Sequence, residues 1–146
     1  MDIMRMESGF VHWGHDISPE ENQYEAGLNF AISYKKNVNF VGKKALLKIK
    51  DERKKKQFIM LTLMSNNPGE PLMLHDEPIY LDNEIIGRTT SGNYSFCYEK
   101  NLSFGYVNSD NSLEFLKDKN LFIEVEKKKY PAEVIIKPLN KKQYKT

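Results

Sequence analysis

The sequence has a single cysteine, no long hydrophobic run and almost no excess of charge of either sign. With only Cys97 there is no internal disulfide, which fits a reducing compartment, and its place between Phe96 and Tyr98 predicts a small core residue. No apolar run approaches the roughly 20 residues that a membrane-spanning helix needs, and the N-terminus has no basic stretch followed by an apolar one. The net charge of +2 argues neither for nor against an anionic partner. These absences predict a soluble, cytoplasmic protein with no membrane contact.

The sequence also lacks the usual motifs of metal, nucleophilic and phosphate chemistry. His12, His15 and Asp16 could be drawn as a metal site, but ligands so close in sequence rarely converge on one ion, and no further Cys or His follows at ligand spacing. We expect a loop with buried or hydrogen-bonded imidazoles there, and His75 in a surface loop. Ser91 has no nearby base in the sequence, and neither a nucleophile elbow nor a glycine-rich phosphate loop is present.

Strand patterns dominate the sequence after residue 56. Residues 85–94 read as a central strand, and the preceding Asp82-Asn83 pair is typical of a two-residue hairpin turn. Gly87 and Gly92 lie inside the strand pattern, which indicates a bulge, a tight bend or a close backbone approach. Because closure removes exposed edges, six strands joined by short hairpins predict a closed antiparallel Greek-key barrel. The expected strands are residues 57–64, 78–81, 85–94, 101–107, 120–126 and 130–137, with a helical turn near 112–117.

The first 56 residues have a different texture. Residues 1–9 look like the last turns of a helix that Gly9 stops. Ser18, Pro19 and Glu21 have the spacing of a helix start, with a capping serine, a proline in the first turn and a glutamate three residues after the cap. We expect a strand over residues 25–34, a helix over 43–52 and a basic linker over 50–56. The fold class is therefore α+β, with a boundary between residues 56 and 57.

Nucleic-acid binding is the alternative function of a different class. It rests on three lysine runs and on aromatic residues that could stack on bases, as in oligonucleotide-binding barrels. The runs are residues 54–56, 127–129 and 141–142, and the aromatic residues are Phe96, Tyr98, Phe104 and Tyr106. Each run falls at an expected turn or tail, however, and 20 acidic residues nearly cancel the 22 basic ones. Solvated turn charges explain the lysines better, so we expect no nucleic-acid partner; a nucleic-acid barrel would need the three runs to converge on one face.

Several linked motifs resemble one enzyme family. They are Arg5-Met6-Glu7-Ser8-Gly9-Phe10, Trp13-Gly14-His15-Asp16, Tyr24-Glu25-Ala26-Gly27-Leu28 and Phe40-Val41-Gly42-Lys43, followed by Gly87-Arg88-Thr89-Thr90-Ser91-Gly92 and Leu102-Ser103-Phe104-Gly105-Tyr106-Val107. In this order they resemble the folate-dependent aminomethyltransferases, which comprise the T-protein of the glycine cleavage system and the C-terminal halves of dimethylglycine and sarcosine dehydrogenases. The Trp-Gly-His-Asp form is similar to the dehydrogenase branch. The resemblance implies that residues 1–56 are the end segment of the folate-binding domain plus a linker, and residues 57–146 the C-terminal barrel and tail.

The resemblance also implies what this chain does not supply. In the family, an N-terminal folate-binding domain precedes the Arg5 motif and carries the aspartate that assists one-carbon transfer. Nothing in this sequence matches that region, and Met1 stands where family members have an arginine that contacts the ligand. The resemblance therefore implies no catalytic residue here, tetrahydrofolate in a shared pocket, and FAD only on a further domain or partner chain. Such a partner would cover exposed apolar surface around residues 1–10 and 24–30.

Four residues carry over as candidates for the folate site. Phe10 falls where the family places an aromatic residue that packs on folate, and Tyr144 matches one that closes over folate from the C-terminus. Trp13 and Asp16 would shape the same wall, although packing and turn hydrogen bonds are the simpler explanation for both. The whole enzyme, as the resemblance implies, passes a methylene group from an amine to tetrahydrofolate, and this chain alone does not catalyse that step.

Overall fold

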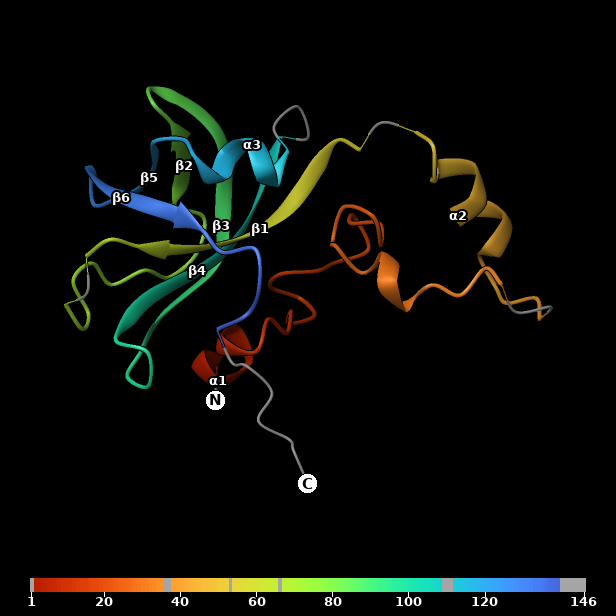
Figure 1. The fold of residues 1–146 in the computed structure, drawn as a ribbon, viewed down its shortest axis with the longest axis horizontal. Coiled ribbons are helices and arrows are strands. Elements are labelled where there is room, and N and C mark those ends of the chain that lie inside the picture. The colour runs from red at the N-terminus through yellow and green to blue at the C-terminus, as the bar shows by residue number, and fades with distance from the viewer. Residues whose placement is uncertain (1, 36–37, 53, 66, 109–111, 140–146) are drawn as a thin grey trace.

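The computed structural model describes residues 2–139 except 36–37, 53, 66 and 109–111. Its main feature is a closed barrel of antiparallel strands, from which a long arm extends to one side (Figure 1). The order around the barrel is β1-β4-β3-β2-β5-β6, so β1 lies beside β4 at the end of the β2-β3-β4 meander, which is a Greek key. The strands are β1 (Lys56–Leu63), β2 (Pro78–Leu81), β3 (Glu84–Ser95), β4 (Lys100–Asn108), β5 (Leu121–Val125) and β6 (Lys128–Val134). The predicted six-stranded barrel is confirmed.

The barrel interior holds one apolar core. In β5, buried residues alternate with half-buried ones, as the two-residue period of a strand requires when one face points inward. Full burial of each Leu, Ile or Val side chain contributes about 1.5–3 kcal/mol relative to exposure. The short helix α3 (Leu113–Lys117), which forms where the sequence predicts a helical turn and is capped by Ser112, adds Leu116. The strand residues of the core are Ile59, Leu61, Leu63, Ile79, Ile86, Val107, Leu121, Ile123, Val125 and Ala132.

Two glycines in β3 allow close approaches that the barrel needs. A Cβ on Gly87 would lie 2.0 Å from the carbonyl oxygen of Tyr106, and one on Gly92 would lie 2.4 Å from Cβ of Met73. Between them, the pairing of β3 with β4 shifts register between Thr89 and Ser91, which marks a bulge. The predicted roles of both glycines in a close approach are confirmed.

The first helix, α1 (Asp2–Glu7), ends as the sequence predicts. Gly9 has φ +73°, and its N–H donates to Met6 O at 3.1 Å while the N–H of Phe10 donates to Arg5 O at 2.8 Å. These two bonds form a Schellman motif, which satisfies the last carbonyl groups of the helix.

Contacts with the outer side of β3 and β4 hold α1 on the barrel. Met6 is buried against Leu102 and Phe104, and the buried carboxylate of Glu7 accepts a hydrogen bond of 2.6 Å from Ser95 Oγ. The N-terminal segment is thus part of the barrel's folded unit.

The arm, defined as residues 18–55, differs most from expectation. The predicted contacts of a helix start do form, since the N–H and Oγ of Ser18 each donate to Glu21 Oε2 at 2.7 Å. No helix follows, however, because the Asn22 side chain accepts from two backbone amides that come after it and so replaces helical bonds. The predicted helix at this position is wrong.

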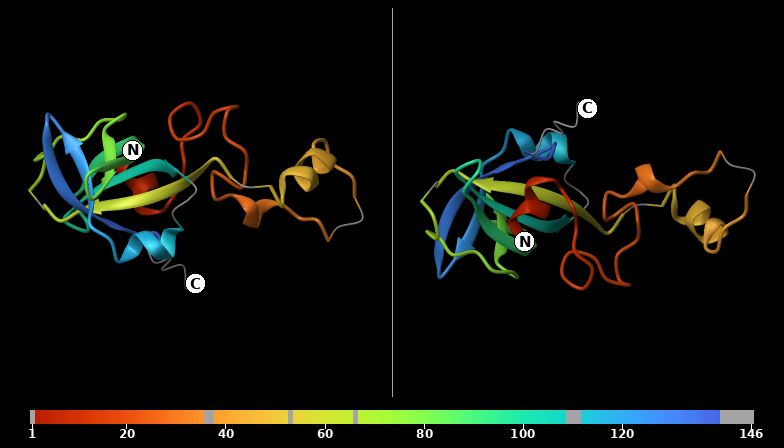
Figure 2. Two further views of the ribbon diagram at one scale, coloured as in Figure 1. Left: turned by 90° about the horizontal axis from the view of Figure 1, so that it is seen from above. Right: turned by 90° about the horizontal axis from the view of Figure 1, so that it is seen from below.

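The predicted strand over residues 25–34 is also wrong, since only the 3₁₀ turn η1 (Asn29–Ala31) forms there. A strand needs a paired neighbour, and isolated elements gain little without tertiary packing. The helix α2 (Lys43–Ile49) does form but ends before the expected residue 52. Between residues 27 and 55, none of the described residues is buried. Figure 2 shows from above and below that α2 lies away from the barrel.

Local contacts give the arm what order it has. The hydroxyl groups of Tyr24 and Tyr34 share a hydrogen bond, and Tyr24 OH donates to Leu46 O at 3.3 Å. Lys50 Nζ lies 5.8 Å from the ring centroid of Tyr34. Burial, together with the bond to Tyr34, raises the pKa of Tyr24 to about 12. These contacts stay within the arm, whereas the N–H of Phe58 in β1 donates to Glu25 O at 2.8 Å and so joins the arm to the barrel.

Three side chains lie elsewhere than the sequence suggests. Cys97 is exposed at the tip of the β3–β4 hairpin, so the predicted core position is wrong: its aromatic neighbours belong to the turn. His12 and His15 are exposed, with stacked rings 4.8 Å apart, and neither ring forms a hydrogen bond with another described residue. The expected burial or hydrogen bonding of these imidazoles is wrong, whereas the surface position of His75 is confirmed. Within the described ranges, no helix is long and apolar enough to cross a membrane.

Candidate functional site

An apolar groove of about 840 Å³ lies where the N-terminal segment and the base of the arm meet the barrel. Its walls come from residues 8–11, from residues 26–30, from β1 and from the stretch after β6. None of the described residues that line it has an ionisable side chain. A planar, largely apolar ligand could fit such a groove, but proton transfer there would need groups from elsewhere. The larger side chains of the lining are Phe10, Leu28, Phe30, Phe58, Met60, Leu113, Ile135 and Ile136.

Phe10 is an exposed ring on a fixed backbone. Its side chain lines the groove although the residue is 64% exposed, while both of its backbone polar groups are bonded to Arg5. The N–H donates to Arg5 O at 2.8 Å, and the carbonyl accepts from Arg5 Nη1 at 3.2 Å. The aromatic position that the sequence assigns to folate is therefore available for stacking.

Asp16, by contrast, is an interior residue with 1% of its surface exposed. Oδ2 accepts from Arg5 Nη1 at 2.6 Å and from the backbone N–H of His12 at 2.8 Å. Oδ1 accepts from Thr90 Oγ1 at 2.5 Å and from Ser91 Oγ at 2.8 Å. With both oxygens bonded to protein donors, the Asp16 side chain joins its own turn, residues 12–17, to α1 and β3. It has no surface to offer a ligand.

The bulge in β3 explains how two successive residues reach the same carboxylate oxygen. In a regular strand, neighbouring side chains point to opposite faces, but a bulge re-aims one of them. The register shift between Thr89 and Ser91 turns the hydroxyls of Thr90 and Ser91 toward Asp16.

The turn is also attached to β4, because Tyr106 OH donates to the carbonyl oxygen of Asp16 at 2.9 Å. Burial, and then the nearby carboxylates of Glu21, Asp16 and Glu25, raise the pKa of the Tyr106 hydroxyl far above its usual range. Tyr106 therefore stays a neutral hydrogen-bond donor at neutral pH.

The four predicted site residues do not form one cluster. Phe10 lines the groove, Asp16 is buried and does not line it, and Trp13 is 67% exposed without lining it. Tyr144 lies outside the described residues. Arg5 and Ser91 were not predicted as site residues, although both occur in the motifs quoted above.

The features of a nucleic-acid barrel are not brought together. β1 runs antiparallel to β6 with Leu63 opposite Ala132, so the lysines at the start of β1 and those at the start of β6 lie at opposite ends of this ladder. Phe104 and Tyr106 are buried and cannot stack on a base, and residues 141–142 lie outside the described residues. No group of three or more His, Cys, Asp or Glu in the described part of the chain could hold a metal ion.

Comparison with known protein families shows which family the chain belongs to. The model of the glycine cleavage T-protein C-terminal barrel domain matches residues 56–141. The chain belongs to this family. The T-protein-type barrel that the motifs suggest is thus confirmed by sequence as well as by strand order.

Individual relatives extend the match into the N-terminal segment. Mitochondrial dimethylglycine dehydrogenase of Homo sapiens is 34% identical over 141 residues, which cover 95% of this chain and 15% of that enzyme. An aminomethyltransferase of Symbiobacterium thermophilum is 34% identical over 106 residues, 73% of this chain and 27% of that protein. The crystal structure of the glycine cleavage system aminomethyltransferase T from Bartonella henselae has the same fold, with a TM-score of 0.79 at 23% identity, over 94% of this chain and 37% of that chain.

The chain is therefore related to a family of folate-dependent one-carbon enzymes, and it spans a minor part of their length: 15% of the human dehydrogenase and 27% of the Symbiobacterium enzyme.

Proposed function

We propose that this chain is the C-terminal portion or subunit of a tetrahydrofolate-dependent aminomethyltransferase, or of a dehydrogenase similar to dimethylglycine or sarcosine dehydrogenase. The whole enzyme would pass a one-carbon unit from an amine to tetrahydrofolate. Residues 1–56 would be the end segment of the folate-binding domain with its linker, and residues 57–146 the covering barrel and tail. The proposal is carried mainly by one observation, the exposed ring of Phe10 on a fixed backbone at the edge of an apolar groove.

In this proposal the chain supplies part of the pocket wall and no catalytic group. Phe10 would stack on the pterin or aminobenzoyl ring, and Tyr144 would close over the folate from the tail. The lack of ionisable side chains among the described lining residues agrees with an acid or base supplied by another domain or subunit, and FAD, in a dehydrogenase, would be bound there too.

The arm supports the need for such a partner. Phe30 is 84% exposed, and a second apolar hollow of about 510 Å³ lies between η1 and α2. Exposed apolar surface of this kind is typical of an interface that another domain covers. The hollow is lined by residues that include Leu28, Ile32, Val38, Phe40, Val41 and Leu46.

Calorimetric titration of the chain with tetrahydrofolate tests the proposal. Phe10→Ala and Tyr144→Ala should each weaken binding about tenfold, the size expected for loss of one stacked ring. Phe96→Ala is the matched control, because Phe96 is an equally exposed ring on the β3–β4 hairpin, away from the groove. Equal losses in all three variants would contradict the assignment. No binding by the folded wild-type chain would mean that the folate contact forms only with the second domain.

A further inference from the structure

The position of the Phe10 ring depends on Arg5, which does not line the groove, and on Gly9, which does. Arg5 bonds both backbone polar groups of Phe10, and the preceding Gly9 has φ +73°, which sets the direction of the chain as it leaves α1. A Cβ on Gly9 would lie 2.5 Å from Cγ of Pro138, so Gly9 packs too closely on Pro138 to carry a side chain.

Arg5 is itself fully engaged. Nη1 donates to Asp16 Oδ2 as well as to Phe10 O, Nη2 donates to Ser91 Oγ at 2.9 Å, and Nε donates to Asp2 Oδ1 at 3.1 Å. The guanidinium group is a planar fork with fixed donor directions, so these acceptors leave it a single orientation. Arg5 has no nitrogen left without a protein partner and does not line the groove.

The connection continues into the barrel. Asp16 accepts from Arg5 with one oxygen and from Ser91 with the other, and Ser91 also accepts from Arg5. Arg5, Asp16 and Ser91 thus form a closed triangle of hydrogen bonds, called here the clamp, between α1, the turn and the bulge of β3. The clamp joins the rigid sheet to the backbone of Phe10.

We propose that the clamp residues Arg5, Asp16 and Ser91 are positioning residues for folate binding, which hold the Phe10 ring in its stacking orientation without contacting the ligand. The proposal rests on the proposed function above. A ring fixed before binding loses less freedom when the ligand stacks on it, and so binds more tightly than a mobile one. A weakened clamp should therefore reduce affinity through Phe10 and by no other route.

A double-mutant cycle with tetrahydrofolate tests this route. Ser91→Ala removes one hydroxyl from the clamp and should raise the Kd about fivefold, but in a Phe10→Ala background the same change should leave the Kd within twofold. Ser95→Ala is the matched control, because Ser95 is a buried serine of β3 that also bonds α1, through Glu7. It should lower Tm to a similar extent and leave the Kd unchanged. The same loss of affinity from Ser91→Ala in both backgrounds, or from Ser95→Ala, would overturn the proposal.

Amide hydrogen exchange without ligand separates this inference from the proposed function. The N–H groups of Phe10 and His12 donate to Arg5 O and Asp16 Oδ2, so Ser91→Ala should speed their exchange about tenfold while Ser95→Ala leaves them unchanged. If the wild-type chain binds no tetrahydrofolate, the folate contact does not form in this chain alone, and the exchange rates still report on the clamp. Unchanged exchange at Phe10 in Ser91→Ala would show that the clamp does not hold this residue.

Discussion

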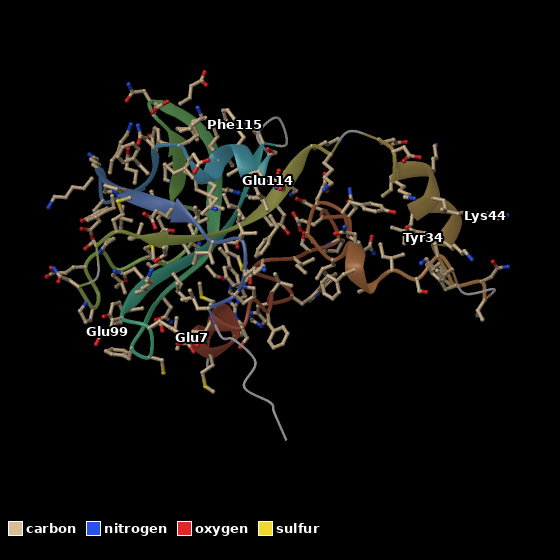
Figure 3. All side chains as sticks on the ribbon, in the orientation of Figure 1. Glu7, Tyr34, Lys44, Glu99, Glu114 and Phe115 are labelled. Atoms are coloured by element: carbon tan, nitrogen blue, oxygen red, sulfur yellow. The ribbon has the colours of Figure 1, made fainter. Side chains whose placement is uncertain are left out.

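The barrel and the arm use similar apolar residues in opposite ways. In the barrel, Ile79 and Leu121 are fully buried and every strand is paired on both sides. In the arm, Phe30 and Val41 point into solvent, and Figure 3 places Tyr34 and Lys44 far from the barrel, whereas Glu7 lies beside it. A closed barrel satisfies its own edges and core, so its sequence suffices to fold it. The arm lacks the surface that would bury its apolar side chains, and this is the part that a further domain would complete.

Limited proteolysis should give the largest difference between the two regions. Trypsin should cut first between residues 43 and 56, on the order of a thousandfold faster than within the paired strands, because the arm opens locally whereas the strands open only on global unfolding. Mass spectrometry of the early fragments identifies the sites. Equally early cutting in the arm and after Arg88 of β3 would contradict the comparison.

Matched leucine substitutions should show which region carries the stability. Leu61 in β1 is 0% exposed and Leu47 in α2 is 46% exposed. Leu61→Ala should lower the free energy of unfolding by about 2–5 kcal/mol, while Leu47→Ala should change it by less than about 0.5 kcal/mol. Urea titration followed by circular dichroism measures both. Losses of equal size would mean that the arm is packed in solution.

Two glycines sharpen the same contrast. Gly87→Ala should cost about 3 kcal/mol or more, because the new Cβ would meet a backbone carbonyl that cannot move without distorting β4. Gly42→Ala places a methyl group in open space at φ +87° and should cost only about 1 kcal/mol of backbone strain. Thermal unfolding of both variants is the measurement, and a cheaper change at Gly87 than at Gly42 would refute the packing described.

The smallest effect on stability is expected at the junction of arm and barrel, where Lys56 of β1 pairs with Glu21 of the arm. Burial alone would raise the pKa of Glu21, but hydrogen bonds from Lys56 and Ser18 outweigh it and hold the pKa below its usual value. A lowered pKa stabilises the folded state above the unfolded pKa of about 4.3, and this contribution is lost as the pH falls through the folded pKa.

Glu21→Gln should therefore destabilise the protein by less than about 1 kcal/mol at neutral pH, and the difference from wild type should shrink between about pH 5 and pH 3. Urea midpoints across this range test it, with Glu84→Gln, an exposed carboxylate at the start of β3, as the control. A difference in stability between Glu21→Gln and wild type that grows on acidification would contradict a lowered pKa of Glu21.

The barrel could be predicted because its signals are local. Alternation in residues 120–126, the Asp82-Asn83 turn and the two glycines of β3 each report on neighbouring residues and agree with one another. The arm could not be predicted, because Ser18 and Glu21 form their expected contacts whether or not a helix follows, and only tertiary packing extends such a start.

The candidate site was predictable only in part. Phe10 could be assigned from the family motif, but the role of Asp16 depends on Thr90 and Ser91, which lie 74 and 75 residues away in the sequence. A one-residue bulge decides that both hydroxyls face the same carboxylate, and no composition or periodicity reveals that. Cys97 was wrongly predicted as a core residue, because its aromatic neighbours suggested a strand where the chain turns.

The most direct test of the proposed folate wall is amide hydrogen exchange over the whole chain, with and without saturating tetrahydrofolate. Folate bound in the groove should add protection at residues 8–11, at 26–30 and along the groove edge of β1 and the stretch after β6, with none at the β3–β4 hairpin tip around Phe96. Protection at the hairpin tip, or an unchanged groove in a chain that calorimetry shows to bind, would contradict the placement of the folate wall.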